Sequence, residues 1–345
     1  MIAVTAAEGA LLVQAAEAVT PQSLARIAEL GAGAPLLALT ERRAHAVGLT
    51  TAKDAKVVTL EIADGTPAQA VRDIADPASD ITFRLPPPRD LAAALLSCAV
   101  AALHLTKLAR LLPTALIAPL AAKELAAVIE ANDLLAVSAA DVDDYDTRAA
   151  RSLKPVSQAR VPLFDAENAR IVAYRPSDGG IEHLAIVIGE PKADQPVLIR
   201  LHSECFTGDL LGSLRCDCGD QLRGAIAAIS EAGSGVLLYL AQEGRGIGLV
   251  NKLRAYQLQD GGADTIDANE QLGFDADERL YLPAAQMLRD MGFSRVRLLT
   301  NNPEKVAALQ ACGIEVVERV PHAFPATQHN KAYLETKAKR SGHLF

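Results

Sequence analysis

Short apolar runs alternate with longer amphipathic stretches through the second half of the chain. The runs IEHLAIVIGE (181–190), QPVLIRLHSE (195–204) and GVLLYLA (235–241) are rich in β-branched and other apolar residues, which predicts strands. The stretches CDCGDQLRGAIAAISEAG (216–233) and IGLVNKLRAYQLQDGG (247–262) predict helices that end at glycines. Because helix and strand patterns keep alternating beyond this point, we expect an α/β domain that binds ligands in the loops after its strands.

The first part of the chain has a different composition. It is rich in Ala and Leu, contains an amphipathic helical stretch at 90–112, and has a Pro run, LPPPRD (85–90), that predicts a loop. The acidic segment DVDDYDTRAARSLKP (141–155) predicts a solvated boundary. We therefore expect an α/β (α+β) protein of two domains, residues 1–150 and 151–345, in this chain of 345 residues.

Composition and charge narrow the class of protein. Hydrophobic residues make up 50% and charged residues 22% of the chain, which is typical of a folded protein. The formal net charge of −8 argues against a nucleic-acid binder that depends on a basic surface. No run approaches the roughly 18 apolar residues of a membrane span, so we expect no membrane partner. The start, MIAVTAAEGALLVQAAEA, lacks the basic region of a secretory signal, which predicts a cytoplasmic protein.

Three of the five cysteines gather in one stretch, HSECFTGDLLGSLRCDCGDQL. Cys205, Cys216 and Cys218 have the spacing C-x10-C-x-C, which favours a metal or catalytic site over three ordinary core thiols. No second CxxC or HxxxH pair follows, so a closed zinc finger is a poor match. Three protein ligands with one open position are the arrangement of catalytic zinc, which lowers the pKa of a bound water to about 7. The alternative is that His202 supplies a fourth ligand and closes the site.

Basic residues and glycines near the thiols suit an anionic ligand. Arg200 precedes the cluster, and EGRG (243–246) follows the strand at 235–241, where glycines let backbone N–H groups approach an anion. TNNPEK (300–305) also follows a predicted strand and opens a helix. Taken alone, EGRG is better explained as a turn, TNNPEK fits a plain helix start as well, and FDADER (274–279) is better explained as a solvated acidic cap.

Taken together, these segments resemble the GTP cyclohydrolase II family. RLHSECFTGDLLGSLRCDCGDQL, YLAQEGRGIGLVNKLRAYQLQDGGADTIDANEQLGF, DADER and VRLLTNNPEKV follow the order and spacing of that family over about residues 160 to 343. The resemblance implies a mixed sheet with helices and a hydrolase that opens riboflavin biosynthesis. It implies that GTP is converted to 2,5-diamino-6-(5-phospho-ribosylamino)pyrimidin-4(3H)-one, formate and pyrophosphate. It also implies one zinc ion per subunit, magnesium on the GTP phosphates, and a homodimer.

The resemblance implies roles for individual residues as well. It places zinc on Cys205, Cys216 and Cys218, and it makes Asp277 a proton acceptor and Arg279 a nucleophile towards the α-phosphate. Because a guanidinium with a pKa above about 12 is a poor nucleophile, a charge-stabilising role for Arg279 stays open. The implied GTP contacts are Arg200, Leu201, His202, Ser203, Glu204, Gln221, Glu243, Gly244, Arg245, Thr265, Thr300 and Lys305.

The residue types agree with this chemistry. Release of formate requires two additions of water at the imidazole C8 of guanine, which zinc-activated water can supply. Departure of pyrophosphate requires positive charge, which Arg200, Arg245, Arg279 and Lys305 carry. Two alternatives use the same residues: a catalytically altered homologue acting on another nucleotide or nucleoside, and a nucleotide-binding regulator.

The first 150 residues resemble a second family, dihydroxybutanone-phosphate synthase, more faintly. LLVQAAEAVTPQSLARIAELG, LLALTERRAHAVGLT, GTPAQAVRDIADPASD and LHLTKLARLLPTALIAP carry the resemblance. The acid loop that binds magnesium in that family is replaced by AVTAAEGA, which leaves only Glu8, and its His-Thr-Glu segment reads Cys98-Ala99-Val100. Without carboxylates nothing holds the metal or moves the proton, so we predict an inactive, structural or dimerising domain. Cys98 and Cys312 are predicted to be buried packing residues.

Overall fold

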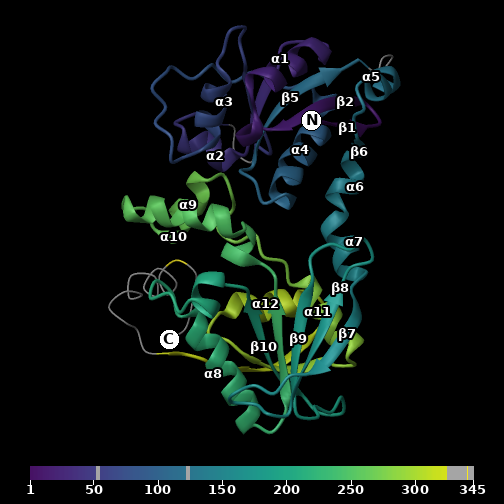
Figure 1. Ribbon diagram of the computed structural model, residues 1–345, viewed down its shortest axis with the longest axis vertical. Helices are drawn as coiled ribbons and strands as arrows, with labels where there is room; N and C mark the ends of the chain where they lie inside the picture. Colours follow the sequence, from purple (N-terminus) through teal and green to yellow (C-terminus); the bar gives the residue numbers. More distant parts are fainter. Residues whose placement is uncertain (52–54, 122–124, 325–339, 341–345) are drawn as a thin grey trace. The chain divides into compact units, whose positions relative to one another are not determined.

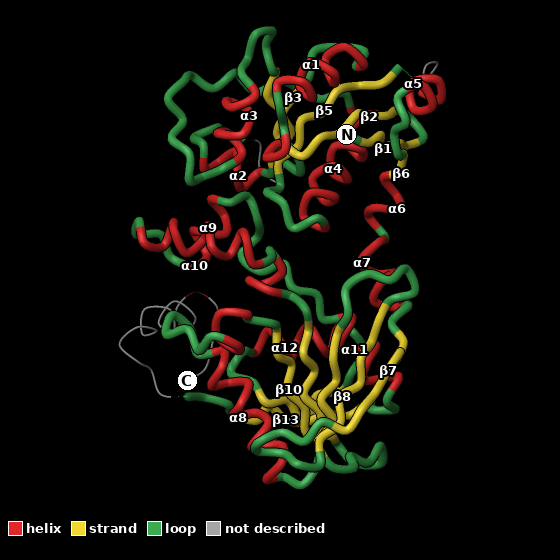
Figure 2. The backbone as a smooth tube through the Cα atoms, viewed as in Figure 1, coloured by secondary structure: helices red, strands yellow, loops and turns green. Residues whose placement is uncertain are grey.

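The computed structural model describes residues 1–51, 55–121, 125–324 and 340, and it divides into two compact units (Figures 1 and 2). The first unit comprises Met1–Tyr145 and Ile247–Glu278, and the second comprises Asp146–Gly246 and Arg279–Phe345. Each unit has its own sheet with helices, which confirms the predicted mixed α/β class. The end of the resembling region, KAKRSGHLF, lies outside the described residues except for residue 340.

The first unit is built on a six-stranded sheet of order β4-β3-β5-β2-β1-β6. Its strands pair antiparallel except for β1 and β6. The strands are β1 (Ile2–Ala6), β2 (Gly9–Ala15), β3 (Leu36–Leu39), β4 (Val58–Glu61), β5 (Thr114–Leu120) and β6 (Ala136–Ser138). The helices are α1 (Pro21–Leu30), α2 (Glu41–Ala46), α3 (Ala68–Ala75), α4 (Leu96–Leu108), α5 (Leu125–Ala131), α6 (Ala139–Asp143), α9 (Leu249–Asp260) and α10 (Thr265–Gln271).

Both faces of this sheet are buried, which explains why its strands read as continuous apolar runs. In β2, Leu11 and Val13 pack in one core with α4, whereas Ala10 and Leu12 pack in the other. The predicted helix at 90–112 is α4, and Cys98 within it is fully buried, as predicted.

The second unit is built on a seven-stranded sheet of order β13-β12-β10-β11-β9-β8-β7. The first four strands of this order run parallel, and β9, β8 and β7 are antiparallel. The strands are β7 (Lys154–Arg160), β8 (Ala169–Arg175), β9 (His183–Ile188), β10 (Val197–Ser203), β11 (Gly235–Leu240), β12 (Arg295–Leu299) and β13 (Glu315–Val320). The helices are α7 (Tyr145–Arg151), α8 (Cys218–Glu231), α11 (Leu282–Asp290) and α12 (Pro303–Ala311). Residues from α8 pack on one face, and residues from α11 and α12 pack on the other.

The predicted strands at 181–190, 195–204 and 235–241 and the predicted helices at 216–233 and 247–262 agree with β9, β10, β11, α8 and α9, but the grouping of these elements differs. The segment 247–278, with α9 and α10, packs in the first unit, so the linear division into 1–150 and 151–345 does not describe the compact units. An amphipathic helix fits either core, and its pattern does not show which core it joins. The stretch at 141–155 is helical and partly buried rather than only solvated, because it contains α7 and the buried Val142 and Ala150.

The parallel strands bring the candidate site to one edge of the second sheet. Because β10, β11 and β12 run in the same direction, the residues that follow them meet at their carboxyl ends. The Glu204 N–H, for example, donates to the Leu240 carbonyl at 2.8 Å. Among the residues that the structure describes, no helix is long and apolar enough to cross a membrane.

We predict that Phe274 is essential to the core of the first unit. Its side chain is 1% exposed and packs with that core, so Phe274→Ala should lower the free energy of unfolding by about 3–5 kcal/mol. Phe164 is 102% exposed, and Phe164→Ala, the matched control, should change it by less than about 0.5 kcal/mol. Urea unfolding measures both variants, and equal stabilities would show that 247–278 does not pack in this core.

Candidate functional site

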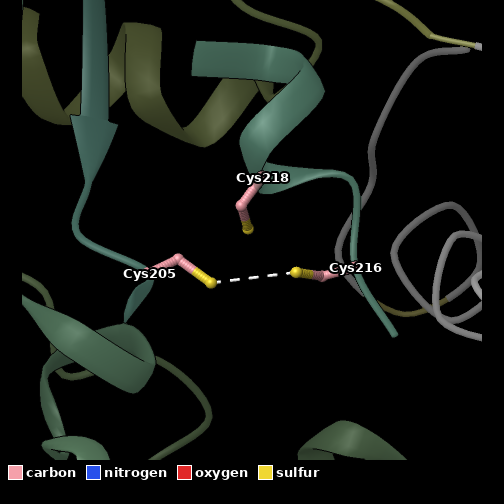
Figure 3. Close-up of side chains that lie close together, drawn as sticks. All are labelled: Cys205, Cys216 and Cys218. Carbon is pink, nitrogen blue, oxygen red and sulfur yellow. Dashed lines mark hydrogen bonds between the residues drawn. The ribbon is translucent and has the colours of Figure 1, made fainter. Parts of the chain in front are cut away.

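Three thiols converge at the carboxyl edge of the second sheet (Figure 3). Cys205 follows β10, whereas Cys216 and Cys218 stand at the start of α8. Their Sγ atoms lie within 4.8 Å of one another, and those of Cys205 and Cys216 are 3.7 Å apart. Tetrahedral zinc with Zn–S bonds of about 2.3 Å separates its sulfurs by about 3.8 Å, so the donor set fits this ion. No other group of His, Cys, Asp or Glu converges in this way in the described part of the chain.

Binding of a cation at the thiols has to displace protons. The hydrogen-bonded Cys205 thiol and burial raise the pKa of Cys216 to about 11, and the neighbouring thiols and burial raise the pKa of Cys218. Because the thiolate is the metal ligand, the affinity of such a site increases with pH.

Two glycines let the loop after Cys205 lie against the thiols. A Cβ atom on Gly208 would be 2.8 Å from the Cys216 Sγ and 3.1 Å from the Cys205 Sγ. A Cβ atom on Gly219 would be 2.4 Å from the Gly208 carbonyl oxygen. Only glycine fits these positions without displacing the cluster, and the sequence analysis did not identify either.

The buried carboxylate of Asp209 anchors the same loop. It accepts hydrogen bonds from the Cys205 N–H and the Tyr239 hydroxyl, each at 3.0 Å, and its two oxygens lie 3.0 Å from the His202 Nε2. The rings of His202 and Tyr239 stack with centroids 5.5 Å apart. Asp209 therefore links the ends of β10 and β11 to a thiol. Nothing in the sequence distinguishes it from other acids, and the sequence analysis missed it.

His202 does not converge with the three thiols in this structure, which argues against the alternative of a closed site. Neither of its ring nitrogens belongs to the converging group, and Nε2 is directed at Asp209. Since a carboxylate only accepts, Nε2 carries the proton in this contact. Burial lowers the pKa of His202, which favours the neutral ring.

Arg200 is a buried cation near the thiols. Its Nη1 donates to the Leu299 carbonyl at 2.8 Å, and its Nη2 donates to Gln221, whose amide in turn donates to Asp217. The Arg200 Nε is buried and has no hydrogen-bond partner among the described residues. Burial lowers the pKa of Arg200 to about 10, which leaves it charged at neutral pH. A buried cation with an unused donor favours an anionic ligand.

The segment 300–305 both caps helix α12 and contributes a buried cation. Asn302 caps α12 by accepting the Glu304 N–H at 2.9 Å, and the Thr300 hydroxyl accepts the Asn302 N–H at 3.0 Å. Lys305 is 7% exposed, and its Nζ donates to the Leu201 carbonyl at 3.0 Å. The predicted helix start is therefore confirmed, and Lys305 in its first turn is a second buried cation.

His322 is a further residue that the sequence analysis missed. Its backbone N–H and C=O both bond to the Asn301 side chain, at 2.8 and 2.7 Å. Its Nε2 lies 2.9 Å from the Gln221 carbonyl oxygen, and burial lowers its pKa to about 4. His322 thus joins the end of β13 to α8, next to the partner of Arg200.

The EGRG turn is tied to the thiol loop. The buried Glu243 accepts the Phe206 N–H at 2.6 Å and the Gly244 N–H at 2.9 Å. Gly244 and Arg245 have positive φ angles of 64° and 61°, so this turn requires a left-handed backbone at two positions. The backbone of Arg245 adopts a conformation that side chains rarely accept, and such residues cluster at functional sites.

The remaining predicted residues fall in both units. Ser203 is the last residue of β10 and Glu204 follows it, and both are half-buried. Arg279 is the first residue of the second stretch of chain that forms the second unit. The Arg279 guanidinium carbon lies 6.0 Å from the Tyr281 ring centroid. Thr265, the first residue of α10, and the exposed Asp277 belong to the first unit.

Three converging thiols beside two buried cations, at the carboxyl edge of a mixed sheet, define the class of a candidate metalloenzyme with an anionic substrate. Residues 154–321 match the family model described as GTP cyclohydrolase II. "GTP cyclohydrolase-2" of Azospirillum brasilense is 54% identical over 357 residues, covering 100% of this chain and 90% of that protein. The chain belongs to the GTP cyclohydrolase II family, as predicted, and is therefore a hydrolase.

Other relatives match a smaller part of the chain. "Riboflavin biosynthesis protein RibBA" of Bacillus cytotoxicus is 56% identical over 174 residues, which are 50% of this chain and 44% of that protein. Among solved structures, RibBX of A. baumannii, titled a two domain 3,4-dihydroxy-2-butanone 4-phosphate synthase, covers 94% of this chain and 96% of its own at 19% identity and a TM-score of 0.37. A synthase of Candida albicans covers 42% of this chain and 90% of its own at 22% identity and a TM-score of 0.34. Likeness of this size assigns no activity to the first unit.

We predict that Asp209 controls metal retention. Asp209→Asn weakens the acceptor that orients the Cys205 loop, so the zinc affinity should fall about 10–100-fold. Asp220→Asn is the matched control, because Asp220 lies on α8 but its side chain is 58% exposed and pairs with Arg223 at the surface. Competition with a chromophoric chelator measures both affinities. A wild-type affinity in Asp209→Asn would contradict the positioning role.

A second prediction concerns His183, whose Nδ1 accepts the Ala241 N–H at 3.1 Å. Burial lowers the pKa of His183 to about 4, whereas an unfolded histidine titrates near 6.5. The unfolded state therefore binds more protons between these values, and the contribution of His183 to stability is lost as the pH falls through this window. The stability difference between wild type and His183→Asn should be larger at pH 7 than near pH 4.5 in urea unfolding. A difference that does not vary with pH would contradict this prediction.

Proposed function

We propose that the protein is a zinc-dependent GTP cyclohydrolase II that acts in the first step of riboflavin biosynthesis. In this proposal GTP, carried with Mg²⁺, is converted to 2,5-diamino-6-(5-phospho-ribosylamino)pyrimidin-4(3H)-one, formate and pyrophosphate. The observation that carries the proposal is the geometry of Cys205, Cys216 and Cys218, whose sulfurs converge beside the buried Arg200 without a fourth side-chain ligand among the described residues.

The three thiols would hold zinc and leave one position for solvent. Zinc bound there would supply Lewis acidity and an activated water for hydrolysis at C8. The residues around the thiols would leave that position free. Asp209 binds the His202 Nε2, which directs the ring away from the thiols, and Gly208 has no side chain that could fill the space beside the sulfurs.

The cations of the second unit would bind the phosphates. Burial, and in addition the nearby Arg279 guanidinium, lower the pKa of Arg200, so the two guanidinium groups repel each other in the free protein. A bound triphosphate would relieve this repulsion and use the unpartnered Arg200 Nε. This arrangement favours a charge-stabilising role for Arg279 in the departure of pyrophosphate, with Asp277 as the proton acceptor.

The first unit, in our proposal, lacks synthase activity. The two positions that resemble the catalytic segments of dihydroxybutanone-phosphate synthase lie together, since the Cys98 Sγ is 3.6 Å from the Gly9 carbonyl oxygen. Apolar side chains fill this place: a Cβ atom on Gly9 would be 2.7 Å from Leu95, and Glu8 is exposed in the turn between β1 and β2. We further propose that the protein is a cytoplasmic homodimer with neither a nucleic-acid nor a membrane partner.

The metal is predicted to act in the chemistry rather than only in folding. Cys216→Ser should abolish zinc retention and the release of formate from GTP, because a hydroxyl replaces one of three thiolates. GTP binding, measured by calorimetry, should persist because the cations are intact. A chelator should have the same effect on the wild-type protein.

The matched control is Cys312→Ser, at a partly buried cysteine outside the cluster. It should keep the zinc and the formate release. Formate release by zinc-free Cys216→Ser would refute the role of the metal, and a wild-type protein that releases no formate from GTP with Mg²⁺ would refute the proposed function itself.

A further inference from the structure

The segment 247–278 leaves the second unit and becomes part of the core of the first. Ala255 of α9, Ala268 of α10, and Leu272 and Phe274 after it are buried in the same cluster as residues of β2, β3 and β5. These residues come from a part of the sequence that matches the cyclohydrolase family, whereas the residues around them come from the first 145. The two stretches therefore share one hydrophobic core and stabilise each other.

Backbone contacts fix the end of α10. The Thr40 hydroxyl donates to the Gly273 carbonyl at 2.7 Å, and the buried Arg43 donates to the Gln271 carbonyl at 2.9 Å. Gly273 has a φ of 91°, and a Cβ atom there would be 3.0 Å from both Pro113 and the Thr40 hydroxyl. The chain is thus held closely against α2 just before it reaches Asp277.

Three ion pairs, on both sides of Asp277, join residues 270–278 to the first 145 residues. The Lys107 Nζ, on α4, lies 2.6 Å from the Glu278 Oε1, and these side chains are only 25% and 20% exposed. The same Glu278 oxygen accepts the Asp275 N–H at 2.9 Å. Arg42 lies 3.3 Å from the carboxylates of both Asp275 and Glu270, at more exposed positions. The Lys107 pair is short and partly desolvated, so it restrains the backbone more than an exposed pair does.

We propose that residues 1–145 of the first unit have a positioning function: they hold residues 265–278 in place for the cyclohydrolase reaction, and Lys107 is the main positioning residue. The proposal rests on the proposed function, which gives Thr265 and Asp277 their roles. It assigns a purpose to residues 1–145, for which we propose no synthase activity. Lys107 acts through Glu278 and the turn that carries Asp277.

The test compares full-length variants at Lys107. Lys107→Met removes the charge and keeps most of the side-chain length, whereas Lys107→Arg keeps the charge. The matched control is Arg89→Met, because Arg89 pairs with Glu61 at 2.6 Å within the first unit and that pair does not involve 247–278. For each protein, kcat and KM for formate release are measured together with zinc content and hydrogen exchange of the peptide covering 270–278.

Lys107→Met should keep its zinc, exchange faster at 270–278, and lose kcat by roughly tenfold or more, since small displacements of a catalytic group are costly. Lys107→Arg should restore most of the kcat, and Arg89→Met should match the wild type. If Lys107→Met does not fold, Arg42→Gln, at an exposed site, should show the same changes on a smaller scale.

Wild-type exchange at 270–278 in Lys107→Met would overturn the proposal, and so would faster exchange with unchanged kcat and KM. The exchange measurement does not depend on GTP. If the wild-type protein released no formate, the proposed function would fail, and the exchange data would still decide whether Lys107 holds this segment.

Discussion

The hydrogen bonds of one buried carboxylate, that of Asp209, connect the sheet of the second unit to its thiols. The carboxylate takes a hydrogen bond from the backbone of Cys205 and another from Tyr239 at the end of β11. His202, on β10, completes the set. A buried carboxylate without hydrogen-bond donors would lower the stability of the fold. The donors around Asp209 therefore favour a single arrangement of the loop. The position of the first thiol is thus fixed by the sheet, and the other two are fixed by the start of α8.

The same edge of the sheet concentrates positive charge next to the thiols. Arg200 and Lys305 are both buried, and each donates to a backbone carbonyl. Burial of a cation lowers the stability of the fold unless the cation is well paired. The Arg200 Nε has no hydrogen-bond partner among the described residues, so the pairing of this cation is incomplete. The proposed triphosphate site would explain both facts, because a bound anion would pair with these cations.

Local features were predictable from the sequence, but their assembly was not. The apolar runs of β10 and β11 and the glycine-ended helix α8 are encoded within short windows, as is the thiol spacing. The place of segment 247–278 in the first core depends on contacts between residues far apart in the chain, which periodicity does not carry. The role of Asp209 has the same origin, because its partners are recruited by the fold. The exposed edge strand β7 was missed since Lys154–Arg160 has no buried face to give an alternating pattern.

The most direct test of the account is X-ray absorption spectroscopy at the zinc edge of the purified protein. We expect one zinc ion per chain, with three sulfur neighbours at about 2.3 Å and one oxygen neighbour, from solvent, at about 2.0 Å. Addition of GTP should change the light-atom shell and leave the three sulfurs in place. A protein without bound zinc, or zinc with a fourth ligand from a side chain, would contradict the central claim that the thiols hold a metal with one open position.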